Sequence, residues 1–366
     1  MMWEKVRFTD IVQDITGGNM KILNNDYLDE GKYPIIDQGS GLIGGYTNEN
    51  SIVKREKDIV IFGDHTKDIK FIDFDFFIGA DGVKILQPYD GLDSKFLYYF
   101  LQTIQIPDVG YSRHFKFLKE LQIPLPPLPI QKRIAEILDT ADALRRKDVA
   151  LLKKYDELAQ AIFIDMFGDP VKNEKGWEVK KLGDLTNISS GSTPDRKKPE
   201  YYLGSIPWVK TTEVRGEIIN KTNEYISKNA LKNSSCKLHP KGSVIVAMYG
   251  QGKTRGQVGL LGIDATTNQA CGVIKPNNSF NSIFLFNYLK NSYNELRKLG
   301  RGGNQENLNA GMLKDFEIMY PPLEIQTRFE SIITLFNTQI SLINGEKSTN
   351  LFNSLLQKAF NGELVS

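Results

Sequence analysis

The stretch PPLPIQKR at residues 126–133 is repeated as PPLEIQTR at residues 321–328, and each copy opens a long segment with helical hydrophobic spacing. Farther upstream, a Trp-Glu pair at residues 3–4 is matched by another at residues 177–178. The order along the chain is therefore globule, helix, globule, helix. Because this period is far longer than those of solenoids or propellers, we interpret the chain as a duplicated domain.

These matches divide the chain into four predicted parts. Residues 1–127 and 171–322 are the predicted globular domains, and residues 128–170 and 323–366 are the predicted helices. Each globule has a length within the usual range of a single domain. A chain of this kind holds two similar but separate recognition surfaces.

The first helical segment has the spacing of a coiled-coil seam, because its apolar residues recur at alternating steps of three and four. At 1.5 Å per residue the helix would be roughly 55 Å long. The second segment has the same spacing with a shift of register near Gly345, and we expect the two helices to pair as an antiparallel coiled coil. The alternative is that each helix packs only on its own globule. The predicted seam consists of Ile134, Ile137, Ala141, Leu144, Leu151, Tyr155, Leu158 and Ile162 in the first helix, and Phe329, Ile332, Phe336, Ile340, Ile343, Phe352 and Leu355 in the second.

Within the globules, short apolar runs alternate with glycine-rich polar loops. Residues 58–62 and 83–86 are predicted strands, and residues 95–101 are a predicted helix. Residues 243–247, 272–274 and 283–289 occupy the corresponding places in the second globule. The predicted fold class is α/β, with mixed α+β domains in tandem duplicate linked by the two long helices.

Composition points to a reduced, cytoplasmic protein. The chain has two cysteines, Cys236 and Cys271, so no disulfide framework is expected. No apolar run approaches the ~18–20 residues that span a bilayer, and we expect no contact with a membrane. The first residues lack the apolar stretch of a signal peptide.

Charge is distributed unequally between the two globules. Residues 171–320 contain 22 Lys and Arg against 13 Asp and Glu, a net of +9, whereas residues 1–125 contain 14 against 19, a net of −5. A globule of net charge +9 suits phosphate. The acidic globule would need local basic loops, or a partner's positive surface, to bind nucleic acid.

One stretch resembles a nucleotide-binding loop. AMYGQGKT at residues 247–254 has the loose form of a phosphate-binding loop, but such a loop leads directly into a helix. The following stretch, RGQVGLLG at residues 255–262, has strand-like alternation and three glycines, which argues against a helix. The same loop suits DNA, because Arg and Lys pair with guanine and phosphate and Gln pairs with adenine.

Other catalytic constellations are absent or weak. Cys236 and His239 form one isolated pair, whereas a metal site needs three or four ligands. No nucleophile-elbow motif occurs. His65 and His114 lie among charged residues, but only the first globule has them. We therefore expect a protein without catalytic residues, cofactor or metal.

Several motifs together resemble the DNA-specificity subunit of type I restriction-modification systems. They are the PPL-x-x-Q-x-R motif before each helix, the Trp-Glu start of each globule, the Gly250-x-Gly252 loop and the run GGNQ-x-NL at residues 302–308. The resemblance covers essentially the whole chain. It implies that each globule is a target recognition domain that reads one half of a split sequence in double-stranded DNA. It further implies that the helices space the domains and dock two modification methyltransferase subunits, and that a restriction endonuclease subunit completes the complex.

We predict DNA contacts in the polar loops of both globules. In the first they are Gln38, Ser40, His65, Lys67, Tyr111, Arg113, His114 and Lys116; in the second they are Thr193, Arg196, Lys210, Thr211, Tyr249, Gln251, Lys253, Arg255, Arg301, Asn304 and Gln305. The alternative for each of them is an ordinary solvated loop residue.

Two other function classes stay open from the sequence. One is a nucleotide-dependent DNA-processing enzyme that uses the Gly252-Lys253-Thr254 loop, for which ATP turnover abolished by Lys253→Ala would be evidence. The other is a protein scaffold without a role in DNA binding, for which the acidic first globule is the best argument.

Overall fold

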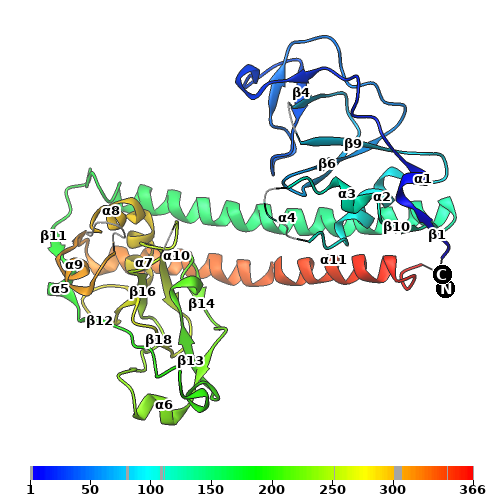
Figure 1. Cartoon of the computed structure of the whole chain (residues 1–366). Helices are drawn as coiled ribbons and strands as arrows, with labels where there is room; N and C mark the ends of the chain where they lie inside the picture. The colour runs from blue at the N-terminus through cyan, green and yellow to red at the C-terminus, as the bar shows by residue number, and fades with distance from the viewer. Residues whose placement is uncertain are drawn as a thin grey trace. The chain divides into compact units, whose positions relative to one another are not determined.

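The computed structural model describes residues 3–79, 82–107, 110, 112–250, 252–300, 307–343 and 345–365. The chain forms two compact units (Figure 1). Unit 1 comprises Met1–Ala150 and Asn344–Ser366, and unit 2 comprises Leu151–Ile343. The longest helix, α4 (Leu128–Phe167), begins in unit 1 and ends in unit 2.

Unit 1 contains two four-stranded sheets and a two-stranded ribbon. The first sheet is antiparallel with the order β2-β9-β6-β7, and the second, with the order β3-β8-β4-β5, pairs β8 in parallel with both neighbours. The strands are β1 (Lys5–Arg7), β2 (Val12–Asp14), β3 (Lys21–Ile22), β4 (Tyr33–Ile36), β5 (Gly45–Thr47), β6 (Ile59–Gly63), β7 (Ile69–Ile72), β8 (Phe77–Gly79), β9 (Val83–Pro88) and β10 (Gln122–Pro124); the helices are α1 (Phe8–Ile11), η1 (Asn24–Asp26), α2 (Ser94–Gln102), α3 (Phe115–Leu118) and, at the C-terminal end, α11 (Gly345–Phe360).

Unit 2 contains a five-stranded sheet in the order β12-β19-β16-β17-β14, a three-stranded sheet in the order β15-β13-β18, and a two-stranded ribbon. Its strands are β11 (Val179–Lys181), β12 (Ile188–Ser190), β13 (Ile206–Val209), β14 (Ile218–Ile219), β15 (Tyr225–Ile226), β16 (Val244–Ala247), β17 (Val258–Leu261), β18 (Thr266–Thr267), β19 (Cys271–Ile274) and β20 (Glu317–Met319); its helices are α5 (Leu182–Leu185), η2 (Pro199–Tyr202), η3 (Thr211–Glu213), α6 (Lys228–Lys232), α7 (Ser282–Asn291), α8 (Tyr293–Lys298), α9 (Ala310–Asp315) and α10 (Leu323–Leu342).

The two units repeat one topology, which confirms the tandem duplication and the mixed α/β fold class. In unit 1 the ribbon pairs β1 with β10, and in unit 2 it pairs β11 with β20. The central antiparallel order β2-β9-β6-β7 recurs as β12-β19-β16-β17. The strands and helices predicted in each globule are present, as β6, β9 and α2 in unit 1 and as β16, β19 and α7 in unit 2.

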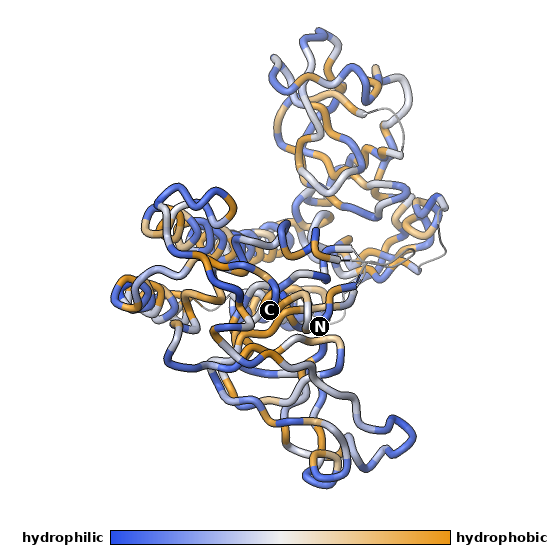
Figure 2. The backbone as a smooth tube through the Cα atoms, turned by 90° about the vertical axis from the view of Figure 1, so that its left-hand side faces the viewer, coloured by the Kyte–Doolittle hydropathy of each residue, from blue (hydrophilic) through white to orange (hydrophobic). Residues whose placement is uncertain are grey.

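Apolar residues fill the interior of each unit. Figure 2 shows hydrophobic segments in the interior of each unit and mostly hydrophilic segments in its outer loops. The largest core of unit 1 contains Phe62, Leu86 and Phe96, whereas that of unit 2 contains Val246, Leu260 and Phe284. Strands β6 and β16 are both buried along their full length, as expected for central strands with both faces covered.

Each unit also contains a pair of packed helices. In unit 2 the ring of Tyr155 lies 5.8 Å from that of Phe336, and the rings of Phe163 and Phe167 lie 5.5 and 5.4 Å from that of Phe329. The numbers rise along α4 while they fall along α10, so the two helices are antiparallel.

In unit 1, the first part of α4 packs against α11. Ile134, Leu138 and Ala141 share a core with Phe352 and Leu356, and Figure 1 shows the two helices side by side and opposed in direction. Helix α10 ends at Leu342 and α11 begins at Gly345, so the second helical segment is interrupted near the position where the sequence indicates a register shift.

The described side chains of the predicted seam differ in burial. Ile134, Ala141, Phe329 and Phe352 are buried, and Ile137, Leu151, Tyr155, Ile162, Ile332, Phe336, Ile340, Ile343 and Leu355 are partly buried. Leu144 and Leu158 are 46% and 45% exposed, so the structure does not bring them into a helix interface. The buried face of α4 instead includes Leu138 in unit 1 and Phe163 in unit 2, because a straight helix of 3.6 residues per turn drifts from a strict seven-residue repeat.

Candidate nucleic-acid interface

Three of the predicted residues of unit 1 belong to one group of loops. The loop after β6 carries His65 and Lys67, and the loop after β4 carries Gln38. The backbone N–H of His65 donates to Gln38 Oε1 at 3.2 Å, and the hydroxyl of Thr66 donates to the carbonyl of Gln38 at 2.6 Å. These two bonds hold the loops together at the carboxyl ends of their strands.

His114 supports this group from beneath. Its side chain is 1% exposed, its Nδ1 lies 2.9 Å from the carbonyl oxygen of Asp64, and the carboxylate of Asp64 accepts the N–H of Phe115 at 2.7 Å. A buried imidazole cannot reach a DNA duplex without a change of conformation. His114 therefore orients the Asp64–His65 backbone in this structure.

Lys67 lies in the loop after β6 and Lys70 lies in β7, and the two differ in environment. Lys67 has a φ of 65°, which is rare outside glycine, and its Nζ donates to the carbonyl of Pro107 at 3.2 Å. Lys70 is buried, donates to the carbonyl of Asp37 at 2.7 Å and lies 3.6 Å from the Asp37 carboxylate. Burial lowers the pKa of Lys70, whereas the charge of Asp37 opposes that shift. Lys70 therefore anchors the loop that carries Gln38.

The remaining predicted residues of unit 1 lie at the surface. Ser40, Arg113 and Lys116 are exposed, and the Lys116 ammonium lies 5.1 Å from the centre of the Phe117 ring. Tyr111 lies outside the described residues, as do Gln251, Arg301, Asn304 and Gln305 of the second globule.

In unit 2, Arg196 and Lys210 converge on one carboxylate. The Arg196 guanidinium donates to Glu224 at 2.7 Å, and Lys210 Nζ donates to the other oxygen of Glu224 at 2.5 Å. The two hydrogen bonds hold the pKa of Glu224 below its ordinary value. Arg196 also lies 4.2 Å from the ring centre of Tyr202 and 4.8 Å from that of Trp208, so its position is fixed by stacking as well as by charge.

The loop at residues 249–257 joins two antiparallel strands, β16 and β17. No helix follows it, so the stretch that resembles a nucleotide-binding loop lacks the helix N-terminus that would hold phosphates. Its carbonyls face α8 instead. Arg297 donates to the carbonyls of Gly252 and Arg255 at 2.8 and 3.0 Å. The hydroxyl of Tyr293 donates to the carbonyl of Lys253 at 2.8 Å.

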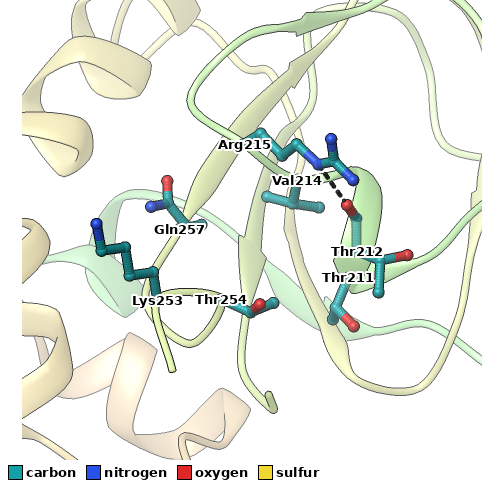
Figure 3. A pocket seen from close by; sticks show the side chains of 7 residues that line it. All are labelled: Thr211, Thr212, Val214, Arg215, Lys253, Thr254 and Gln257. Atoms are coloured by element: carbon teal, nitrogen blue, oxygen red, sulfur yellow. Dashed lines mark hydrogen bonds between the residues drawn. The ribbon is translucent and has the colours of Figure 1, made fainter. Parts of the chain in front are cut away.

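Side chains of the same loop line a hollow of about 250 Å³ (Figure 3). The predicted residues Thr211 and Lys253 both lie there. The other lining residues are Thr212, Val214, Arg215, Thr254 and Gln257. Arg215 and Gln257 were not predicted from the sequence. Each lies just before a short strand, β14 or β17, and the structure pairs these two strands in parallel.

The other predicted residues of unit 2 have different surroundings. Thr193 donates to the side-chain oxygen of Gln269. Tyr249 is 41% exposed, and Arg255 is partly buried. The loops thus bring Thr211 together with Lys253 at the hollow, and Arg196 together with Lys210 on one carboxylate. The two pairs are neighbours along the chain, because Lys210 directly precedes Thr211.

The cysteine and histidine residues of unit 2 have structural surroundings. Cys236 lies in a small core with Trp208 and donates to the carbonyl of Ser192 at 3.2 Å. His239 is fully buried, and burial lowers its pKa to about 4. Among the described residues no group of three or more His, Cys, Asp or Glu has an arrangement suited to a metal ion. Within the same ranges, none of the helices combines the length and the apolar character of a membrane span.

Comparison with known proteins places these features in a family. The model of the type I restriction modification DNA specificity domain matches residues 2–153 and again residues 174–351. The specificity subunit of the type I restriction enzyme EcoR124I/EcoR124II from Escherichia coli is 27% identical over 339 residues, which cover 86% of this chain and 81% of that protein. The MjaIX specificity subunit from Methanocaldococcus jannaschii is 27% identical over 315 residues, covering 77% of this chain and 72% of that protein.

A solved structure has the same fold. The crystal structure of the type I restriction-modification S subunit from M. genitalium aligns with a TM-score of 0.68 at 18% identity, covering 98% of this chain and 96% of the other. The tandem match and the repeated topology coincide, and neither the relatives nor the loop at residues 249–257 supports a nucleotide-dependent enzyme. The chain therefore belongs to the type I restriction-modification DNA specificity family, whose members are non-catalytic DNA recognition subunits, and it carries two specificity domains in tandem.

Proposed function

We propose that the chain binds double-stranded DNA through both units and that each unit reads one half of a split target sequence. The single observation that carries this proposal is that one fold occurs twice with unlike loops. Unit 1 presents Gln38 and His65 where its loops meet, whereas unit 2 presents Lys253 and the Arg196–Lys210 pair. Two readers of the same fold with different side chains suit two unrelated half-sites.

The proposed DNA-contacting surface consists of the residues predicted from the sequence, with His114 and Asp64 as positioning residues. The net charge of +9 in residues 171–320 supports phosphate binding by unit 2. For unit 1, with its acidic balance, the exposed Arg113 and Lys116 would supply local positive charge to phosphate.

The proposed role of the long helices is to space the two units and to dock two modification methyltransferase subunits, with a restriction endonuclease subunit completing the assembly. Helix α4 supports this role because it continues without interruption over 40 residues, roughly 60 Å at 1.5 Å per residue. The antiparallel helix pair within each unit supports a two-stranded coiled coil as the spacer. The proposed domain limits remain residues 1–127, 128–170, 171–322 and 323–366, and the proposed compartment is the cytoplasm.

The test is to express the chain with its methyltransferase subunits and to map modified bases across the genome of the host. A motif of two parts separated by unread bases is expected. Duplexes carrying that motif should lose binding when either part is scrambled or when the gap is lengthened by two base pairs. A single uninterrupted motif, or no protected DNA at all, would contradict the proposal, and the second result would favour a protein scaffold.

Variants connect each half to its unit. Arg113→Ala should weaken discrimination in one part of the motif and Arg255→Ala in the other, each by about 1–3 kcal/mol if the side chain reaches a base. Lys172→Ala is the matched control, because Lys172 is an exposed cation that lies 3.6 Å from Glu174 and outside both groups of loops. Native mass measurement of the complex checks the expected two methyltransferase subunits per chain.

A further inference from the structure

Two loops of unit 2 are joined side by side at the hollow of Figure 3. The backbone N–H of Gly216 donates to the carbonyl of Val258 at 2.8 Å, which places Arg215 and Gln257 on adjacent backbone segments. A Cβ added to Gly216 would lie 3.8 Å from Gln257 Oε1, so the Gln257 side chain lies against this junction. Gly216 has a φ of 80°, a conformation that favours glycine.

Arg215 is exposed, and one hydrogen bond orients its guanidinium. Its Nε donates to the carbonyl of Thr212 at 2.7 Å, as the dashed line of Figure 3 shows. Among the described residues, its two terminal nitrogens have no hydrogen-bond partner. A guanidinium tethered through Nε presents the remaining pair of donors as a fixed fork, the geometry that pairs with O6 and N7 of guanine.

Gln257, like Arg215, combines a fixed attachment with side-chain hydrogen-bonding groups that point to no described partner. Its backbone is fixed, because its N–H donates to the carbonyl of Thr254 at 3.1 Å and its carbonyl accepts the N–H of Ala247 at 2.8 Å. Its carboxamide has no hydrogen-bond partner within the described parts of the chain. A carboxamide offers one donor and one acceptor in a plane, which matches N7 and the amino group of adenine.

The loop backbones under both residues are held in advance of binding. Arg297 and Tyr293 bind three carbonyls of the loop that leads to Gln257, and Glu213 binds the N–H groups of Lys210 and Asn223 beneath the loop that leads to Arg215. Preorganised donors favour discrimination between bases, because less conformational freedom is lost when they bind.

The cations that line the hollow, unlike Arg196 and Lys210, have no carboxylate beside them in the lining. Arg196 and Lys210 share the carboxylate of Glu224, whereas the residues that line the hollow include two cations, Arg215 and Lys253, and no carboxylate. Lys253 is exposed on the other side of the hollow (Figure 3). A base edge or a phosphate at the hollow would therefore meet cations and no carboxylate in its lining.

We propose that Arg215 and Gln257 are two base-reading residues of unit 2, which recognise a guanine and an adenine on neighbouring base pairs, while Lys253 binds a backbone phosphate. This inference rests on the proposed function and narrows it to two side chains. It predicts that the part of the target read by unit 2 contains a G·C pair next to an A·T pair.

The experiment uses the full chain in complex with its methyltransferase subunits, and compares the modified-base maps of the unchanged protein, R215A, R215K, Q257A and K253A. R215A and R215K should each relax one G·C position of one part of the motif, because the lysine keeps the charge but lacks the fork. Q257A should relax the neighbouring A·T position. The loss of discrimination should be roughly 5- to 150-fold at that position, and the other part of the motif should stay unchanged.

K253A is the contrasting variant, because a phosphate contact carries no sequence information. It should leave the motif intact, weaken binding to all duplexes about equally, and reduce the slope of log affinity against log salt by about one. Recovery of each variant in the assembled complex with an unchanged melting temperature shows that it is folded.

Two results overturn the inference and are distinguishable. If the unchanged complex yields no two-part motif, the proposed function itself is wrong and the inference falls with it. If the motif has two parts but R215A, R215K and Q257A all retain it in full, or relax both parts equally, the proposed function stands and the assignment of these two residues is wrong.

Discussion

The backbone N–H of Asn281 donates a hydrogen bond of 2.9 Å to Oε1 of Gln326. Asn281 is the N-cap of α7, where its side chain accepts the N–H groups of Ile283 and Phe284. The fully buried carboxamide of Gln326 also donates to the carbonyl of Pro321 at 2.8 Å. In unit 1, Gln131 binds the N–H of Asp93, the N-cap of α2, in the same way. The glutamine of each repeated motif thus ties the start of a long helix to the cap of a domain helix.

Replacement of Gln131 by Leu should destabilise unit 1 by about 2–4 kcal/mol. The change removes the partners of the Asp93 N–H and of the carbonyls of Gly91 and Pro126, and buried groups without partners lose their hydration uncompensated. Urea denaturation followed by circular dichroism measures the change. Gln160→Leu, on an exposed part of the same helix, should leave the midpoint almost unchanged, and equal losses in the two variants would contradict the role of Gln131.

The helix pair of unit 1 should be sensitive to charge at Leu138 and tolerant of it at Leu144. The sequence pattern predicts that a charge at Leu144 disrupts the pair, but Leu144 is 46% exposed whereas Leu138 is fully buried in the core that contains Phe352. Leu138→Asp should therefore cost several kcal/mol, because an unpaired charge is buried, and Leu144→Asp less than about 1 kcal/mol. Thermal unfolding of the two variants distinguishes them, and the reverse order would show that the seam follows the strict heptad.

The stabilising contribution of the Glu224 carboxylate to unit 2 should be lost in acid. Hydrogen bonds from Arg196 and Lys210 lower its pKa from 4.5, so its contribution is fully present above the pKa of the unfolded chain and is lost as the pH falls through the lower pKa of the folded state. Glu224→Gln should cost up to about 1 kcal/mol at pH 7, as expected for a partly exposed ion pair. The difference from the unchanged protein should shrink in denaturation experiments carried out below pH 4.5. A difference that stays constant down to pH 2 would mean that the carboxylate charge is not involved.

Arg297→Ala should weaken DNA binding without changing the recognised sequence. Arg297 binds two carbonyls of the loop at residues 249–257, so its loss leaves the loop to be ordered when DNA binds. We expect an affinity lower by about 5- to 30-fold, equivalent to roughly 1–2 kcal/mol, and an unchanged motif in the modified-base map. Lys298→Ala is the matched control, since Lys298 is the next residue along and pairs with Glu295 of the same helix. A changed motif in Arg297→Ala would mean that this residue itself contacts bases.

The repeated motif and the apolar runs predicted the tandem fold because a duplicated sequence must bury the same residues twice. The runs that became β6 and β16 are buried on both faces, and such runs differ clearly from their polar surroundings. The seam was predicted less well at Leu144 and Leu158. Periodicity locates an apolar stripe, but the packing partner decides which side of the stripe is covered.

The loop residues were predictable in type but not in arrangement. Lys253 and Thr211 share a hollow, whereas Arg196 and Lys210 share a carboxylate with Glu224, which lies 28 and 14 residues away along the chain. Arg215 and Gln257 lie on adjacent backbone segments because the N–H of Gly216 donates to the carbonyl of Val258. Such long-range pairings depend on the register of the strands, which a single sequence does not reveal.

The division of the long helices between the units has a consequence for synthesis of the protein on the ribosome. Unit 2 is formed by one uninterrupted stretch, but the core of unit 1 includes Phe352, Leu356 and Ala359, which are translated after all of unit 2. The core of unit 1, which contains Ile134 and Leu138, therefore stays incomplete until residues 352–359 have been made. The half that is translated second is complete first, and a nascent chain that stops before residue 352 keeps an exposed apolar helix face for chaperones to bind.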